Sequence, residues 1–142
     1  VKKRCEYWQR NNMDHEIIGG QISLADGTKF PISEAVRAGD FVFLAGQIAF
    51  GEDGKLHGED IETQTRQCIE NIQTMLAQTG CELGNIVKAT VWLVDKNDFS
   101  GFNDVYAEYF NNNPPVRSAV RSDLMLPGAL VEIEVVAYRR EG

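Results

Sequence analysis

The segment that most constrains the fold is the last apolar stretch of the chain, residues 130–139, where side chains alternate between two faces. Such alternation predicts a β-strand. One face is wholly apolar and is expected to pack against helices, whereas the other is apolar at its ends and acidic in the middle. The first face holds Val131, Ile133, Val135 and Ala137, and the second holds Leu130, Glu132, Glu134, Val136 and Tyr138. Helices on one side only would leave the second face in water.

Two other segments show apolar residues at every third or fourth position, which is the period of an amphipathic helix. The first is capped by Asp60 and stops at Gly80, and the second begins near Asp98 and ends at two prolines. Further strands are predicted from Phe30 and at residues 41–45, 87–94 and Val116–Arg121. The order β-β-α-β-α-β-β predicts an α+β domain with both helices on one face of a mixed sheet.

The outer face of that sheet is expected to be a subunit interface. In residues 87–94, alternation places Val87 with the core-facing set and Trp92 on the outer face. Trp92 adds to the Leu, Val and Tyr side chains that the last strand leaves there. An apolar sheet face of this kind predicts a homo-oligomer with clefts between its subunits.

Length and composition limit the class of protein. A chain of 142 residues that is 43% apolar can form one domain with a real core, which we place at residues 29–142. Residues 1–28 are interpreted as an N-terminal arm in which Tyr7 and Trp8 pack against the body or a neighbour, or else as a frayed terminus. No apolar run approaches the roughly 20 residues of a membrane span, and no signal-peptide pattern is present, so a cytoplasmic protein is expected.

Charge and ligand-type residues restrict the possible partners. The formal net charge of −7 argues against nucleic acid, which needs clustered Lys and Arg, but it allows a small anion held by one or two arginines. The three cysteines form no C-x-x-C pair, and His15 and His57 lie far apart. A zinc site needs three or four convergent ligands, so we expect neither a metal nor another cofactor. Cys68 falls on the apolar stripe of the first helix and is expected to be a buried thiol.

Arg117 and Arg121 are the leading candidates for binding chemistry. Alternation puts both on one face of the strand Val116–Arg121, together with Ala119. If the opposite, more apolar set faces the helices, the arginines share the outer sheet face with Glu132 and Glu134. Arginine can grip a carboxylate through two parallel hydrogen bonds, and a nearby glutamate can deprotonate a water. The same charges could instead form a cross-strand ion pair that only helps to set the register.

Two further positions are candidates for ligand contact. Asn103 lies beside the apolar stripe of the second helix and is either a solvated polar residue or a ligand donor. The turn at Gly46 and Gln47 follows a strong strand and could present backbone N–H groups to an oxyanion. A turn that simply requires glycine is the alternative.

Five ordered motifs give the chain a resemblance to a known family, covering roughly residues 30–140. In sequence order they are Pro31-Ile32-Ser33-Glu34-Ala35-Val36, Ala45-Gly46-Gln47-Ile48, Phe99-x-x-Phe102-Asn103-x-x-Tyr106-x-x-Tyr109-Phe110, Pro115-Val116-Arg117-Ser118, and Leu126-Pro127 followed by Val131-Glu132-Ile133-Glu134. Together they resemble the Rid family of reactive intermediate deaminases, also called the YjgF/YER057c/UK114 family.

The resemblance implies a chorismate-mutase-like fold and a homotrimer whose sheets line an inner barrel, with three sites at the subunit interfaces. It also implies hydrolysis of 2-imino or 2-enamino acids to 2-oxo acids and ammonia, without cofactor or metal. Under this resemblance Arg117 binds the substrate carboxylate and Glu132 positions the attacking water. Asn103 and the backbone of Gly46 line the pocket.

Three positions depart from the pattern of the deaminating members. Ile32 stands where they usually carry an aromatic residue, and Ala119 where they often carry a cysteine. The loop after Arg117 is about one residue longer and contains Arg121, which adds a second cation. These departures indicate a different substrate, either larger or with two carboxylates.

Two functions therefore remain as hypotheses. The first is a metal-free hydrolytic deaminase of a reactive imine or enamine that carries a carboxylate. The second is a non-catalytic, trimeric binding protein that holds a small carboxylate metabolite at Arg117. The presence of Glu132 favours the enzyme, whereas Ile32 and Ala119 favour the binding protein.

Overall fold

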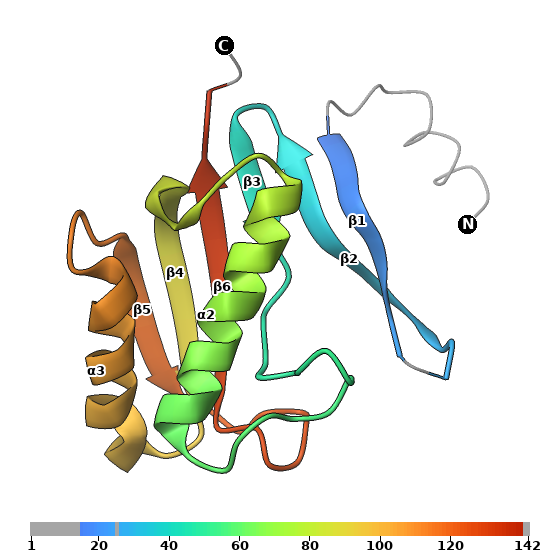
Figure 1. Cartoon of the computed structure of the whole chain (residues 1–142). Helices are drawn as coiled ribbons and strands as arrows, with labels where there is room; N and C mark the ends of the chain where they lie inside the picture. The colour runs from blue at the N-terminus through green and yellow to red at the C-terminus, as the bar shows by residue number, and fades with distance from the viewer. Residues whose placement is uncertain (1–14, 25, 141–142) are drawn as a thin grey trace.

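The computed structural model describes residues 15–24 and 26–140. One six-stranded sheet, in the order β1-β2-β3-β6-β4-β5, carries α2 and α3 on the same face (Figure 1). Two single-turn helices, η1 and η2, precede β4 and α3. The elements are β1 His15–Ser23, β2 Lys29–Ala38, β3 Phe41–Leu44, α2 Ile61–Gln78, η1 Leu83–Asn85, β4 Ile86–Leu93, η2 Lys96–Asp98, α3 Phe99–Phe110, β5 Val116–Arg121 and β6 Val131–Tyr138.

The sheet is mixed, as predicted. All neighbouring strands are antiparallel except β4 and β5, which run parallel and are joined through α3. A parallel pair needs a crossover connection, and α3 provides one that packs back on the sheet. From β2 onward the element order is the predicted one, so the α+β class and the placement of both helices on one face are confirmed. In the described part of the chain, no helix is long and apolar enough to cross a membrane.

The core lies between α2, α3 and the helix-facing side of the sheet. Asp60 caps α2 by accepting a 2.8 Å hydrogen bond from the backbone N–H of Thr63. The helix ends at Gln78, with Thr79 as its C-cap and Gly80, whose φ is +75°, after it. Cys68 is buried and forms no disulfide, as expected. The inner face of β6 is also confirmed, because Val131, Ile133, Val135 and Ala137 are all at most 1% exposed.

Strand β1 was not predicted. The N-terminal arm was placed at residues 1–28, yet His15–Ser23 forms the edge strand of the sheet and pairs with β2. Its pairing is irregular between Ile18 and Gln21, where Gly19 and Gly20 take positive φ values. A Gly-Gly pair is typical of a turn, but here the two glycines bend a strand at a bulge. Tyr7 and Trp8 lie outside the described residues.

A bulge also changes the start of β4. The pairing with β6 shifts between Ile86 and Lys88, so Ile86 and Ala89 are both buried while Val87 is 40% exposed. The prediction that Val87 belongs to the core-facing set is therefore wrong. An extra residue in one strand reverses the alternation on one side of the bulge, and sequence periodicity does not detect it.

Within residues 15–24 and 26–140, no helix or loop covers the sheet face opposite α2 and α3, which we call the bare face. Phe41, Phe43 and Tyr138 remain 38–46% exposed although they come from neighbouring strands. Their rings form one group, with centroids 5.2 Å apart for Phe41 and Tyr138 and 6.5 Å apart for Phe41 and Phe43. Tyr138 lies on the outer face as the sequence predicts. Leu130 was expected on the same face but packs against the core instead, and the prediction did not include Phe41 and Phe43.

Candidate functional site

Arg117 lies on the helix-facing side of the sheet, not on the outer face. It pairs in register with Ala89 of β4, which is 1% exposed beneath the helices. Val116 and Val120, the apolar residues of β5, point the other way and are 69% and 48% exposed. The expectation that Arg117 shares a face with Glu132 is therefore wrong. The cross-strand ion pair considered as its alternative is excluded for the same reason.

Three aromatic rings of α3 surround the guanidinium of Arg117. Its central carbon lies 4.7 Å from the ring centroid of Tyr106, 5.4 Å from that of Phe102 and 5.7 Å from that of Phe99. The ring faces are electron-rich and attract a planar cation without neutralising it. Within the described residues no carboxylate forms an ion pair with Arg117. The rings therefore hold a guanidinium whose charge no carboxylate side chain of the described residues neutralises.

Phe102 is fully buried, and Tyr106 has 6% of its surface exposed. Burial raises the pKa of its hydroxyl, and the positive charge of Arg117 opposes part of that increase. Asn103 is half-buried on the same helix, four residues after Phe99 and three before Tyr106. That spacing puts the Asn103 amide on the flank of α3 that carries these two rings. Asn103 thus lies on the same flank of α3 as two of the rings that contact Arg117.

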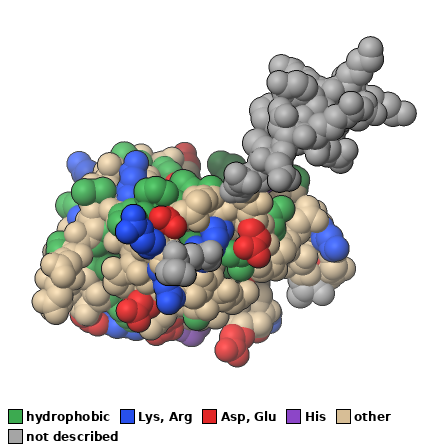
Figure 2. Space-filling view, turned by 90° about the horizontal axis from the view of Figure 1, so that it is seen from above, with side chains coloured by type: hydrophobic (Ala, Val, Ile, Leu, Met, Phe, Trp, Pro, Cys, Tyr) green, Lys and Arg blue, Asp and Glu red, His purple; other side chains and the backbone are tan. Residues whose placement is uncertain are grey.

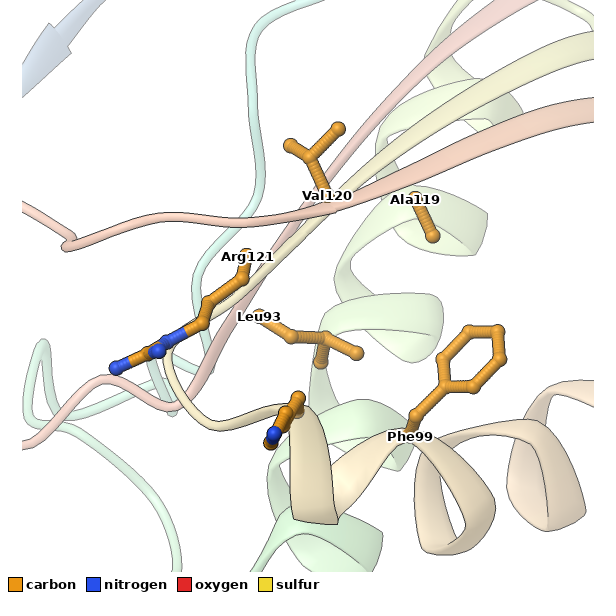
Figure 3. A pocket seen from close by; sticks show the side chains of 6 residues that line it. Leu93, Phe99, Ala119, Val120 and Arg121 are labelled. Atoms are coloured by element: carbon orange, nitrogen blue, oxygen red, sulfur yellow. The ribbon is translucent and has the colours of Figure 1, made fainter.

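A cavity of about 200 Å³ continues from this cluster toward the end of β5. In Figure 3, Phe99 and Ala119 lie on one side of Leu93 and the side chain of Arg121 on the other. Arg121 donates from Nε to the backbone oxygen of Val94 at 3.2 Å. The lining residues are Leu93, Lys96, Phe99, Ala119, Val120 and Arg121. Two predicted site residues, Ala119 and Arg121, therefore line one cavity together.

Glu132 lies on the opposite, outer face of the sheet, between the buried residues Val131 and Ile133 of β6. The Glu132 carboxyl packs directly against Gly46. A Cβ at position 46 would collide with Oε1 of Glu132 and lie 3.0 Å from its Cδ. The pKa of Glu132 is raised, first by burial and second by the negative charge of Glu134. Gly46 thus leaves the space that a partly desolvated carboxyl group occupies.

The backbone N–H of Gln47 is not available to an oxyanion. It donates to the carbonyl of Ile133 at 2.8 Å, and the N–H of Ile133 donates back to the carbonyl of Gln47 at 3.0 Å. This two-bond bridge ties the turn to β6. The role predicted for the turn is therefore wrong as far as Gln47 is concerned, and Gly46 serves the site through its missing side chain.

One protomer does not bring all the predicted site residues together. Arg117, Ala119 and Arg121 share the helix-facing side of β5 and Asn103 lies on α3, whereas Glu132 and Gly46 meet on the other face of the sheet. Ile32 is on β2, and β3, β6 and β4 lie between β2 and β5.

The contacts of Phe99, Phe102 and Tyr106 with Arg117, and the position of Lys96 beside the cavity, do not follow from the sequence. The three aromatic residues have the spacing of an ordinary core-facing stripe. Their spacing was visible, but nothing in it showed that an arginine would meet the rings.

Comparison with known proteins gives a consistent result. The family model described as Endoribonuclease L-PSP matches residues 25–139. A RutC family protein of Pyrococcus horikoshii is 44% identical over 110 residues, which cover 77% of this chain and 87% of that protein. The human protein named 2-iminobutanoate/2-iminopropanoate deaminase is 35% identical over 116 residues, covering 81% and 85% of the two chains.

Solved structures agree with the sequence matches. Yeast Mmf1 superposes with a TM-score of 0.79 at 30% identity, covering 89% of this chain and 99% of that chain. A Mycobacterium tuberculosis member of the YjgF/YER057c/UK114 family gives a TM-score of 0.69 at 35% identity, covering 76% and 86%. The sheet topology and these structural matches define an α+β protein of the chorismate-mutase-like type. The chain belongs to the YjgF/YER057c/UK114 family, which is also called the Rid family.

Proposed function

We propose that the protein is a hydrolytic deaminase of a reactive imine or enamine that carries a carboxylate, acting without a metal or other cofactor. The observation that carries this proposal is the Arg117 guanidinium, held on three rings with no carboxylate partner in the described chain. A planar fork in that state fits a small organic carboxylate. The human relative's name, 2-iminobutanoate/2-iminopropanoate deaminase, supports the same class of substrate.

The active site is proposed to lie between two protomers of a homotrimer. Arg117 and Glu132 lie on opposite faces of one sheet, so they cannot approach the same ligand within a protomer. The bare outer face, with Phe41, Phe43 and Tyr138, provides the apolar surface that trimer formation would bury. In this arrangement Arg117 of one protomer faces Glu132 of the partner subunit across the interface.

The reaction requires orientation and proton transfer. An imine carbon is electrophilic, and more so when its nitrogen is protonated. Arg117 holds the substrate carboxylate, and Glu132 takes a proton from water as the water oxygen bonds to the imine carbon. The proton then passes to the nitrogen of the carbinolamine. As the C–N bond breaks, the carbinolamine hydroxyl gives its proton to Glu132, which releases it to solvent, and ammonia and a 2-oxo acid leave. The raised pKa of Glu132 makes it a stronger base for the first of these steps.

A second candidate function is a trimeric protein that binds a carboxylate without reaction. The observation that favours it is the aliphatic Ile32 and the small Ala119 at positions where the resemblance leads one to expect an aromatic residue and a cysteine. Neither side chain can donate a hydrogen bond or a proton to a reacting group. Such a protein would still use Arg117 to hold its ligand.

Nucleic acid is not the proposed partner, although the matching family model carries the description of an endoribonuclease. The net charge is −7, and on the face drawn in Figure 2 Lys and Arg side chains stand among Asp, Glu and apolar ones rather than forming one basic field. A filter-binding assay with RNA at low salt tests this directly. We expect no binding by the intact protein.

Ammonia release tests the proposed function. An amino acid oxidase generates imines in solution from alanine or 2-aminobutanoate, and ammonia is followed with and without the protein. We expect ammonia release to be accelerated over the buffer rate. Carboxylate binding at Arg117 without acceleration for any imine would establish the binding protein instead.

A further inference from the structure

We propose that Lys96 and Arg121 form a second anion-binding subsite, so that the preferred substrate is a 2-imino or 2-enamino dicarboxylate. This inference rests on the proposed deaminase function and specifies its substrate class. It assigns a role to Lys96 and to Arg121, which line a cavity whose Phe99 also contacts the Arg117 guanidinium.

Strand β5 places Arg117 and Arg121 on one surface, separated along the strand. Arg117, Ala119 and Arg121 follow each other at alternate positions and pair in register with Ala89, Val91 and Leu93 of β4. At about 3.3 Å per residue, the Cα atoms of the two arginines are about 13 Å apart along the strand. Ala119 lies between them and adds only a methyl group. A ligand can therefore run along the strand from one cation to the other.

The cavity is lined by apolar side chains and by two cations. Leu93, Phe99 and Ala119 supply hydrocarbon surface, while Lys96 and Arg121 supply the charges. A carbon chain would replace water at the apolar residues, and its far carboxylate would meet the two cations. Among the residues that the structure describes, no carboxylate side chain lines this cavity. The cavity is therefore complementary in charge to the far carboxylate of a dicarboxylate whose reactive end is bound by Arg117.

Neither cation is neutralised by a neighbouring acid. In the described part of the chain, Lys96 and Arg121 take part in no ion pair. Asp95 precedes Lys96, but its Oδ1 accepts a 2.8 Å hydrogen bond from the backbone N–H of Asn97 and caps η2. The Nε–H of Arg121 is held by the carbonyl of Val94, which fixes the stem of the side chain while its two terminal nitrogens remain to meet an anion.

Two series of imines test this subsite. Oxidation of aspartate and glutamate gives 2-imino dicarboxylates, and oxidation of alanine and 2-aminobutanoate gives monocarboxylates of similar reactivity. For each series kcat/KM is measured on the wild type, Lys96→Gln, Arg121→Gln and the double variant. We expect wild type to prefer the dicarboxylates at least tenfold and the double variant to lose that preference. Lys55→Gln removes a cation from the loop before α2 and is the matched control, with the preference retained.

A binding measurement separates this inference from the proposed function. Calorimetric titration with 2-oxoglutarate and with 2-oxobutanoate reports affinity whether or not turnover occurs. Tighter binding of 2-oxoglutarate that is lost in the double variant supports the subsite even if no imine is hydrolysed, in which case only the deaminase proposal fails. Equal affinity for the two acids, or a preference that survives in the double variant, overturns the subsite even if monocarboxylic imines are hydrolysed rapidly.

Discussion

Gly46 and the carboxyl group of Glu132 occupy adjoining space on the outer face of the sheet, so that any side chain at position 46 would overlap the carboxyl. Backbone strain is not the reason for glycine here, since Gly46 is not among the glycines with positive φ. The turn is fixed by the bridge between Gln47 and Ile133 and has little freedom to retreat.

Gly46→Ala should therefore displace the Glu132 carboxyl. We expect at least a tenfold loss in kcat/KM for imine hydrolysis with a small change in melting temperature, because a displaced side chain on an open face can move without unfolding the core. Gly84→Ala is the control, since a Cβ at position 84 meets nothing within 4 Å. Wild-type activity in Gly46→Ala would show that the placement of Glu132 does not matter.

Arg117→Lys should weaken substrate binding although it keeps the positive charge. Lysine lacks the planar fork that grips a carboxylate through two bonds and stacks on Phe102 and Tyr106. We expect KM to rise at least tenfold, measured by steady-state ammonia release. Arg66→Lys alters another arginine that lies over a ring, that of Tyr109 at 5.9 Å, and should leave KM as it is. An unchanged KM in Arg117→Lys would remove Arg117 from carboxylate recognition.

Glu132→Gln should lower the rate and change the pH dependence of stability. A general base contributes about 10²–10⁴-fold, so kcat should fall by about 100-fold or more. Because burial and Glu134 raise the pKa of Glu132 in the folded protein, ionising it costs stability as the pH rises through that pKa. The variant avoids this cost. Relative to wild type, we expect the variant to gain stability between acid and neutral pH, as measured by urea unfolding across that range. A difference in unfolding free energy that does not vary with pH would contradict this account.

Phe43→Glu should disrupt the proposed trimer. Phe43 is 46% exposed in the centre of the bare face and pairs with Val36 and Val136 on either side. A buried, unpaired carboxylate at an interface is strongly unfavourable. Light scattering coupled to gel filtration should give a trimer mass for wild type and a smaller mass for the variant. Ala77→Glu adds the same charge to an exposed position of α2, on the other side of the molecule, and should remain trimeric. A monomeric wild type would refute the inter-subunit site.

Gln64→Leu should destabilise the fold without touching the site. Gln64 is fully buried in α2, where its Nε2 donates to the carbonyls of Gly58 and Gly128 and its Oε1 accepts from the N–H of Leu130 at 2.8 Å. Leucine would leave these backbone groups unpaired, at a cost of about 3 kcal/mol in unfolding free energy. Gln73→Leu, exposed on the same helix, should change it by less than about 0.5 kcal/mol. Urea unfolding with equal losses in the two variants would exclude this role for Gln64.

Local patterns in the sequence were enough to predict most of the fold. The cap at Asp60 and the stop at Gly80 delimit α2, and the β5 strand Val116–Arg121 has the bounds that its alternation predicts. The signals behind these predictions are local, because capping and periodicity depend on residues within a few positions of each other. Strand β1 was missed because Gly19 and Gly20 resemble a turn until the partner strand β2 is known.

The amino-acid sequence by itself determined which side chains share a face: Arg117 with Ala119 and Arg121, and Glu132 with Glu134. Only the tertiary structure decided which face that is. Alternation with a period of two is the same whichever side of a strand is turned to the core. Which face turns to the core depends on the register with the neighbouring strand and on the side chains that the helices place against the sheet. Here α3 offers three rings to which a guanidinium can be attracted, and that contact between residues far apart in the chain separates Arg117 from Glu132 within each protomer.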